Sequence, residues 1–337
     1  GEHDINVLGG WTYQSYDMEQ LSVSSQGFSN DITAYHAIET GDPELTNASS
    51  DESEWTLLSA LFRFNYIFKD KYFLTVSGRS DGSSRLAEGN KWQFFPSTAL
   101  AWRVSKEPFL DNASAISNLK LRASYGRTGS QSIAPYATLA RLNSGTNFLG
   151  DQQLVTFIPA VSANPTLRWE VTDQFNFGAD IGMLKNRLNL TIDYYYKKTT
   201  DLLLERELAY QTGFSERLEN IGSLENKGLE ISVDGIIIDK NEFSWSSRLT
   251  FASNRNKVLE LFGDKTFIEG GRGTRIILGE PIGTFFGVKY LGVYQDDDPD
   301  LGDNNPGEPK FEDLDGNGII TVDDAQIIGS AIPDFYG

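Results

Sequence analysis

The residues whose types and spacing could do chemistry lie in an acidic stretch near the end of this sequence. From Asp313 the chain runs DLDGNGIITVDD, with oxygen-bearing side chains at alternate positions. The groups that could bind one ion are Asp313, Asp315, Asn317, the Ile319 carbonyl, Thr321 and Asp324. Carboxylate, amide, hydroxyl and carbonyl oxygens are hard ligands, and Ca²⁺ binds several of them together. The stretch therefore predicts a calcium site.

The spacing of this stretch resembles that of an EF-hand or dockerin loop. Counted from Asp313, oxygen ligands stand at positions one, three and five, and Gly318 stands at six, where the chain must turn sharply. Position twelve is Asp324, whereas the pattern has Glu, and this shorter arm leaves weaker binding or another register open. The alternative is an acidic turn without an ion. We expect any ion to be structural and to brace an external loop, because the stretch lies outside the alternating segments described below.

Two further groups of side chains are candidate binding residues. Asp296, Asp297, Asp298 and Asp300 could form a second cation site, although a solvated run of charge is the favoured interpretation. Trp92 and Trp169 stand at predicted loop–strand junctions and could stack on a sugar ring. Anchoring at a membrane interface is the favoured interpretation of both, because Trp has an apolar body and a polar N–H.

Enzyme chemistry has little support in this sequence. The two histidines, His3 and His36, lie far apart and have no matched partner, and cysteine is absent. The GxSxG and HExxH motifs and phosphate-binding glycine loops are missing. Acidic pairs are abundant, so a glycosidase pair stays open, but no particular pair is singled out. We expect no catalytic residue and no organic cofactor.

The elements that must position these residues are strands, and the clearest pair lies between Trp169 and Leu204. Residues 171–183 and 188–196 alternate between apolar and polar side chains, with one exception at Asp173, and a short polar turn joins them. Period two indicates strands, and about ten residues suffice to cross a bilayer at a tilt. Tyr194 and Tyr196 would face lipid, and only Tyr195 could face a lumen and contact a sugar. The alternative is a hairpin of a large soluble β-sandwich.

The same alternation recurs along the chain. It predicts strands at 5–14, 58–68, 72–79, 94–104, 119–125, 229–237, 243–251 and 283–294. Turns at 69–71, 184–187 and 239–241 are short, whereas the predicted loops at 15–53, 80–92, 127–168 and 205–222 are long, and 254–282 is mixed. Short turns at one end and long loops at the other are typical of an outer-membrane barrel. A sandwich has no reason to sort its loops in this way.

Composition narrows the class of protein. The 337 residues carry a net charge of −18, which excludes a nucleic-acid partner and fits neutral or cationic solutes or calcium. The hydrophobic fraction is 39%, and no apolar run is long enough for a transmembrane helix. Alternating strands escape such a search. There is no initiator Met or signal peptide, so we expect a fragment of a longer precursor.

Several stretches resemble SusC/RagA-type TonB-dependent outer-membrane transporters. They are 79–110 (RSDGSSRLAEGNKWQFFPSTALAWRVSKEPFL), 116–130, 169–204, 220–235, 279–295 and the acidic segment that ends IIGSAIPDFYG. They follow one another in the expected order over nearly the whole chain. The resemblance implies an all-β fold, an antiparallel transmembrane β-barrel of 22 strands. Residues 1–337 would be its central part, without the plug domain or either chain end, and 296–330 would be an acidic extracellular loop.

The resemblance also implies a function and partners. Family members import oligosaccharides, or sometimes oligopeptides, across the outer membrane of Gram-negative cells. A SusD-like surface lipoprotein caps the barrel, and TonB with ExbB and ExbD pulls on the plug. The alternatives are a secreted, calcium-braced β-rich module for glycan binding or adhesion and, third, an outer-membrane enzyme.

Overall fold

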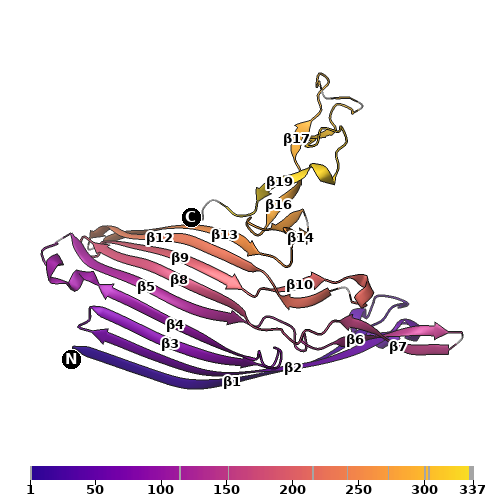
Figure 1. The fold of residues 1–337 in the computed structure, drawn as a ribbon, viewed down its shortest axis with the longest axis horizontal. Helices are drawn as coiled ribbons and strands as arrows, with labels where there is room; N and C mark the ends of the chain where they lie inside the picture. The colour runs from indigo at the N-terminus through magenta and orange to yellow at the C-terminus, as the bar shows by residue number, and fades with distance from the viewer. Residues whose placement is uncertain are drawn as a thin grey trace.

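The computed structural model describes residues 2–333 except 114, 151, 215, 241, 272, 300 and 303. Within these residues, nine long strands form one antiparallel sheet in which the order of strands follows the chain (Figure 1). They are β1 (His3–Ser24), β2 (Asn47–Phe68), β3 (Tyr72–Ser83), β4 (Trp92–Arg103), β5 (Ile116–Ser130), β8 (Glu170–Met183), β9 (Leu188–Thr200), β12 (Ser223–Lys240) and β13 (Phe243–Glu260). The sheet is a curved meander that does not close on itself.

Smaller elements lie beyond the ends of this sheet. Two hairpins are formed by β6 (Arg141–Leu149) with β7 (Gln152–Val161) and by β10 (Leu203–Glu207) with β11 (Glu216–Asn220). After β13, a four-stranded sheet contains β14 (Phe267–Gly271), β15 (Thr274–Ile277), β16 (Thr284–Val288) and β19 (Ala325–Ser330), and β17 (Tyr290–Val293) pairs with β18 (Pro309–Phe311). This segment stands away from the main sheet (Figure 1).

The helical elements are short 3₁₀ turns. They are η1 (Ala34–Thr40), η2 (Pro43–Leu45), η3 (Val104–Lys106), η4 (Pro108–Leu110), η5 (Tyr210–Thr212) and η6 (Val322–Asp324). Among the residues described, no helix has the length and apolar character that would let it span a membrane.

The main sheet has one apolar and one polar face, because cross-strand partners share a face and neighbours along a strand alternate. Phe177 lies opposite Tyr194, and Tyr194 lies opposite Leu229. We call this side the apolar face; it also carries Phe62, Phe64, Tyr66, Leu74, Leu100, Leu121, Ile192, Ile231, Leu249 and Phe251. The opposite, polar face carries Arg63, Arg79, Asp81, Lys120, Arg122, Asp180, Asp193, Glu230, Asp234 and Arg248.

Charges on the polar face are paired across strands. Arg122 of β5 donates to Asp180 of β8 at 2.9 Å and forms an ion pair with Asp193 of β9 at 3.0 Å. On β3, Arg79 contacts Asp81 at 2.6 Å. Such ladders of fixed charge give this face a polar surface that favours water over lipid.

Most connections sort by length between the two ends of the sheet, as predicted; the exception is the β4–β5 connection at 104–115, which lies at the same end as 69–71 and is longer than the β3–β4 connection at 84–91. The connections at 69–71 and 184–187 are short, and that between β12 and β13 is two residues long, although its residue 241 lies outside the described residues. At this short-turn end, Glu107 accepts hydrogen bonds from the Tyr72 hydroxyl at 2.7 Å and from Trp102 Nε1 at 3.1 Å. The Lys71 ammonium donates to the same carboxylate at 3.1 Å. The turn after β4 is thereby attached to two aromatic residues of the apolar face.

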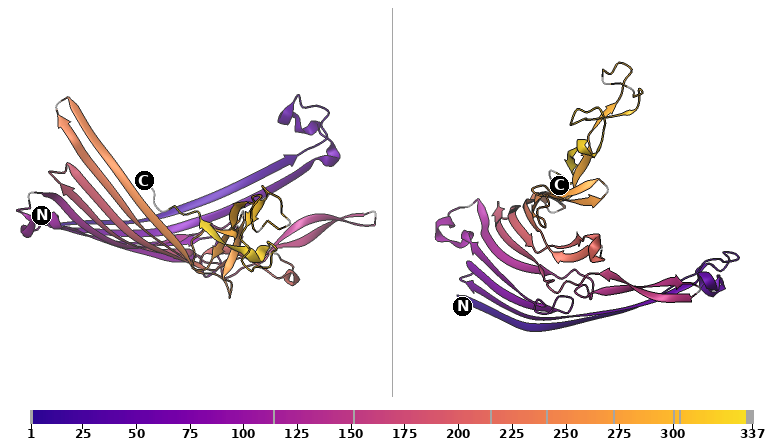
Figure 2. Two further views of the ribbon diagram at one scale, coloured as in Figure 1. Left: turned by 90° about the horizontal axis from the view of Figure 1, so that it is seen from above. Right: turned by 45° about the vertical axis from the view of Figure 1, so that its right-hand side comes forward.

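Three predicted boundaries are wrong. Most of the predicted loop at 15–53 is strand, since β1 and β2 stay paired from His3↔Phe68 to Ser24↔Asn47. Figure 2 shows this ribbon extending beyond its neighbours. Its outer half is wet on both sides, so its sequence carries no apolar alternation. The single strand predicted at 283–294 is β16 and β17 in different sheets, and the predicted loop at 205–222 contains most of the β10–β11 hairpin.

Candidate functional site

The long-loop end of the sheet has a buried apolar core of its own. It packs side chains from β4 and from the β3–β4 and β5–β8 connections, and we call it the loop core. Its buried members are Leu86, Phe95, Ile133, Ala137, Leu167 and Trp169. Burial of these side chains holds the β3–β4 and β5–β8 connections against β4, because removing apolar area from water is the main favourable term in packing.

Trp169 is central to the loop core. The side chain is 4% exposed, its ring meets Phe95 edge to face at 5.4 Å between centroids, and its Nε1 donates to the Lys91 carbonyl at 2.9 Å. Neither a glycan nor a lipid can stack on a ring that is already enclosed. Sugar stacking and membrane anchoring, the two interpretations of Trp169 from the sequence, are therefore both wrong, because the ring packs against other residues of this chain.

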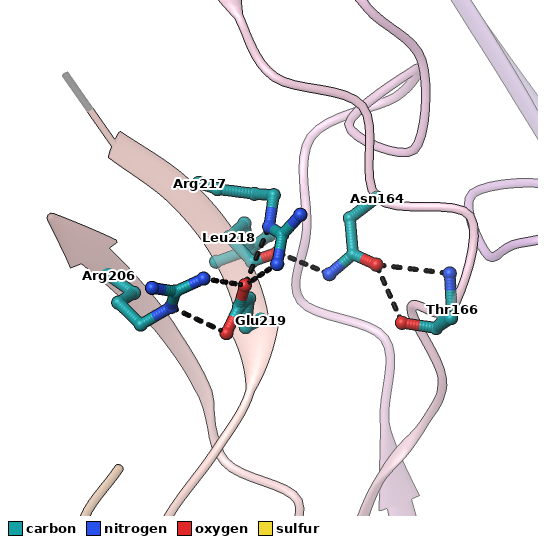
Figure 3. Close-up of polar contacts among 6 residues, drawn as sticks. All are labelled: Asn164, Thr166, Arg206, Arg217, Leu218 and Glu219. Carbon is teal, nitrogen blue, oxygen red and sulfur yellow. Dashed lines mark hydrogen bonds and ion pairs between the residues drawn. The ribbon is translucent and has the colours of Figure 1, made fainter. Parts of the chain in front are cut away.

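A polar junction attaches the β10–β11 hairpin to the loop core (Figure 3). Asn164, 5% exposed, donates from Nδ2 to the Leu218 carbonyl of β11 at 2.7 Å. Its Oδ1 accepts from the Thr166 backbone N–H at 3.0 Å and from the Thr166 hydroxyl at 2.7 Å. One amide therefore supports its own loop and holds the hairpin.

The hairpin is closed by an ion pair beside this junction. Arg206 of β10 makes two hydrogen bonds to Glu219 of β11, at 2.9 and 2.8 Å, and Arg217 adds another from Nε at 2.6 Å (Figure 3). Hydrogen bonds from Arg206, and then from Arg217, hold the pKa of the Glu219 carboxyl below its usual range against the opposing effect of burial. The resulting stabilisation is complete above the ordinary glutamate pKa and is lost as pH falls through the lowered value.

An aromatic surface that the sequence did not single out lies where β1 and β2 leave the sheet. Tyr16 and Trp55 are cross-strand partners whose rings stack at 5.8 Å, and the Arg85 guanidinium lies 4.1 Å from the Trp55 ring centroid. In the part of the chain that the structure describes, Arg85 has no carboxylate partner and its Nε has no hydrogen-bond partner. We call these three residues the aromatic platform. Trp55 shares its face with Ser59, which receives a hydrogen bond from Arg79, so the platform continues the polar face.

Tyr195 and Trp92 lie on opposite faces. Tyr195 is on the polar face, where its hydroxyl donates to Asn254 Oδ1 at 3.0 Å, while Tyr194 is on the apolar face, so the predicted alternation is confirmed. Trp92 is 55% exposed on the apolar face, where its ring covers Gly82 so closely that a Cβ there would lie 2.7 Å from Cζ2. Of the three aromatic candidates, only Tyr195 faces the polar side.

The acidic loop between β18 and β19 folds around its own carboxylates. Oxygens of Asp313, Asp315 and Asp324 lie within 4.8 Å of one another. Asp313 accepts from the N–H groups of Gly316 and Gly318 at 2.8 and 2.7 Å. The fully buried Asp324 accepts from the N–H groups of Leu314 at 2.9 Å and Thr321 at 2.7 Å.

Two further predicted ligands, Asn317 and Thr321, accept hydrogen bonds from backbone N–H groups of the same loop. Asn317 accepts from the Ile319 N–H at 2.7 Å, and Thr321 caps η6 by accepting from the Asp323 N–H at 3.2 Å. The hydrogen bond from the Thr321 N–H is the main reason that the pKa of Asp324 lies below its usual range, so its carboxylate stays charged. The donor set consists of hard oxygens and fits a calcium ion.

The second candidate cation cluster is partly accounted for by an ion pair. Asp298 contacts the Lys310 ammonium at 2.7 Å, and Lys310 also lies 5.4 Å from the Tyr294 ring centroid. Asp300 lies outside the described residues. Asp298 is therefore a largely buried partner of Lys310 and not part of a solvated run of charge, whereas Asp296 and Asp297 are exposed.

Comparison with known proteins identifies the class. A family described as "TonB dependent receptor-like, beta-barrel" matches residues 2–315, so the chain belongs to that family of outer-membrane β-barrel proteins. It is 41% identical to "TonB-dependent receptor P3" of Formosa agariphila over 99% of this chain and 35% of that protein. It is 32% identical to "TonB-dependent receptor SusC" of Bacteroides thetaiotaomicron over 97% of this chain and 33% of that protein.

A solved structure gives the more particular relationship. The "Structure of the RagAB peptide transporter" matches with a TM-score of 0.84 and 27% identity, over 99% of this chain and 36% of that chain. The chain is thus similar in sequence and in fold to TonB-dependent proteins of the SusC/RagA type, as the sequence motifs predicted. It spans about a third of the length of these relatives.

The ion pair of the β10–β11 hairpin can be tested in the full-length protein that contains this chain. Glu219→Gln leaves Arg206 and Arg217 without a carboxylate, and we expect local opening of the hairpin to become easier by about 1–3 kcal/mol. Hydrogen exchange of residues 203–220 should therefore accelerate by roughly 5- to 150-fold.

The matched control is Glu216→Gln, an exposed position on the same strand β11. It should exchange as the unchanged protein does. Equal exchange in both variants would show that the Glu219 ion pairs do not hold the hairpin.

Proposed function

We propose that the full protein imports a nutrient, most simply an oligosaccharide, across the outer membrane. TonB drives the transport, and a SusD-like lipoprotein caps the barrel on the cell surface. The observation that carries this proposal is the two-faced meander, which aligns over nearly its whole length with transporters. Within a closed barrel of this family, the apolar face meets lipid and the polar face lines the lumen.

The aromatic platform supports a carbohydrate cargo. Sugar rings have apolar faces that stack on aromatic rings, and Tyr16 and Trp55 are stacked side by side near the long-loop end. Tyr16 is 44% exposed, so part of the platform is open to solvent. Arg85 adds a cation whose N–H groups suit hydroxyl or carboxylate oxygens.

An oligopeptide is the second candidate cargo. The RagAB structure is described as that of a peptide transporter, and this chain resembles it at 27% identity. A guanidinium beside aromatic rings would also bind a peptide carboxylate and its side chains. Identifying the bound cargo therefore distinguishes a glycan importer from a peptide importer with the same fold.

Cargo identity is tested by purifying the full-length transporter with its partner lipoprotein and analysing bound molecules by mass spectrometry. We expect an oligosaccharide, and we expect Trp55→Ala to lower the amount bound per transporter by roughly tenfold, because a stacking surface worth about 1 kcal/mol or more is removed. Trp92→Ala is the matched control on the apolar face and should leave cargo unchanged. A bound peptide would contradict the glycan proposal. An equal decrease in bound cargo in both variants would show that the aromatic platform does not bind the cargo.

We also propose that the acidic loop binds one structural Ca²⁺ through Asp313, Asp315 and Asp324, with Asn317, the Ile319 carbonyl and Thr321 completing the site. The cluster of carboxylate oxygens within 4.8 Å supports this proposal, because Ca²⁺ binds several hard oxygen ligands gathered around one point. The ion would brace the external segment between β18 and β19 and would take no part in transport chemistry.

Calcium titration of the chelator-treated full-length protein tests this second proposal. Asp315→Asn replaces an exposed ligand and should weaken Ca²⁺ binding by on the order of tenfold or more. Asp323→Asn, which changes an acidic residue outside the cluster, should leave the affinity unchanged. Binding that is absent in the unchanged protein, or identical in all three, would favour an acidic turn without an ion.

A further inference from the structure

A row of basic side chains crosses the apolar face just beyond its aromatic residues. Along β9 the apolar face runs Ile192, Tyr194, Tyr196 and then Lys198. Lys198 lies opposite Asp173 of β8 and Glu225 of β12. The basic side chains, which we call the basic collar, are Arg127, Lys198, Lys227, Arg255 and Lys257; Arg127, Lys198 and Lys257 share one cross-strand row with Asp173 and Glu225, and Lys227 and Arg255 lie in the next row, level with Tyr196.

The basic collar contains five basic side chains, with two acids among them, in a chain whose net charge is −18, and its Arg255 also donates to the Pro333 carbonyl at 2.9 Å. Its two carboxylates already pair with basic residues of the collar. Asp173 binds Arg127 through two hydrogen bonds of 2.9 Å, and Glu225 pairs with Lys227 at 3.1 Å. Within the described residues, Lys198 and Lys257 form no ion pair, and both are exposed.

The collar lies at a particular level of the sheet. Directly next to it stand Tyr125, Phe175 and Tyr196, and the long loops begin within a few residues on the other side. Aromatic residues of a barrel mark the boundary between hydrocarbon and headgroups. Because the long loops are external, the collar falls at the headgroup level of the outer leaflet.

The wall below the collar is hollowed. A groove of about 880 Å³ runs over β3, β4, β5, β8 and β9. Tyr72 and Trp102 line it toward the short-turn end, and Tyr194, four residues before Lys198 on β9, lines it toward the collar. Small side chains at Ala123 and Ala179 lie between larger ones at Leu100, Phe177 and Ile192 and lower the surface there. The groove is apolar and matches the chains of a lipid whose headgroup reaches the collar.

We propose that the basic collar binds the phosphate groups of an outer-leaflet glycolipid whose acyl chains lie in the groove. Phosphate accepts strong charge-assisted hydrogen bonds from Lys and Arg, and the partner must also be anchored in lipid, because the cations stand on the apolar face beside tyrosines. This inference rests on the membrane placement of the family and is independent of the cargo, so either can fail alone.

Binding of purified lipid A to the full-length transporter in neutral detergent tests the proposal. The lipid with two phosphates is compared with its dephosphorylated form. Each lysine near an anionic headgroup is worth about 1 kcal/mol, which is about fivefold in affinity, so K198Q/K227Q/K257Q should bind on the order of a hundredfold more weakly. The control K69Q/K185Q/K240Q removes three lysines from the short-turn end and should bind as the unchanged protein does.

Four outcomes would overturn the proposal. They are equal binding by the two triple variants, equal binding of the two lipids, failure of phosphorylated lipid A to bind the unchanged protein, and binding of inorganic pyrophosphate as tight as that of lipid A. The last would indicate a site for a free anion. If the collar triple variant fails to fold, K198Q alone can be used, because it breaks no ion pair within the described residues. It should bind lipid A about fivefold more weakly, and unchanged binding by K198Q would also contradict the proposal.

Discussion

The structure depends on one constraint, which is that a backbone in hydrocarbon has no water to satisfy its N–H and C=O groups. In the described sheet, the seven inner strands meet this requirement by pairing with a neighbour on each side, and the edge strands β1 and β13 pair on one side. The pleat then forces side chains to alternate, so one sheet presents Phe177 and Tyr194 to one side and Asp180 and Asp193 to the other. The same strands therefore present an apolar surface on one side and a polar surface on the other.

Side chains from different segments pack together at the two ends of the described sheet. At the long-loop end, Trp169, Leu167 and Phe95 form a compact core, and Asn164 attaches the β10–β11 hairpin to it. At the short-turn end, Glu107 fixes a turn to Tyr72 and Trp102. The wall is thus held at both rims, and the residues suited to bind solutes, lipid headgroups or ions lie at or beyond its long-loop end.

The sequence predicted the strands that have one wet and one apolar side, because period two is visible there, as in residues 171–183. It failed for the outer half of β1 and β2, where both sides are wet and the alternation vanishes. The aromatic platform was missed for the same reason, since Tyr16 lay in the predicted loop at 15–53 and Trp55 lay before the strand predicted at 58–68. Trp169 was misplaced because burial by loops that lie far apart in the sequence leaves no local pattern. The cluster of carboxylates in the acidic loop was predicted because its members are close in sequence.

A cysteine scan of β9 tests the central claim, the assignment of its two faces, most directly. The chain contains no cysteine, so single substitutions at 190–197 in the full-length transporter, in outer membranes, can be labelled with a water-soluble maleimide. The two-faced wall predicts reaction at 191, 193, 195 and 197 and protection by lipid at 190, 192, 194 and 196. Reaction without a period of two would contradict it, and the sheet would then have to lie in water on both sides.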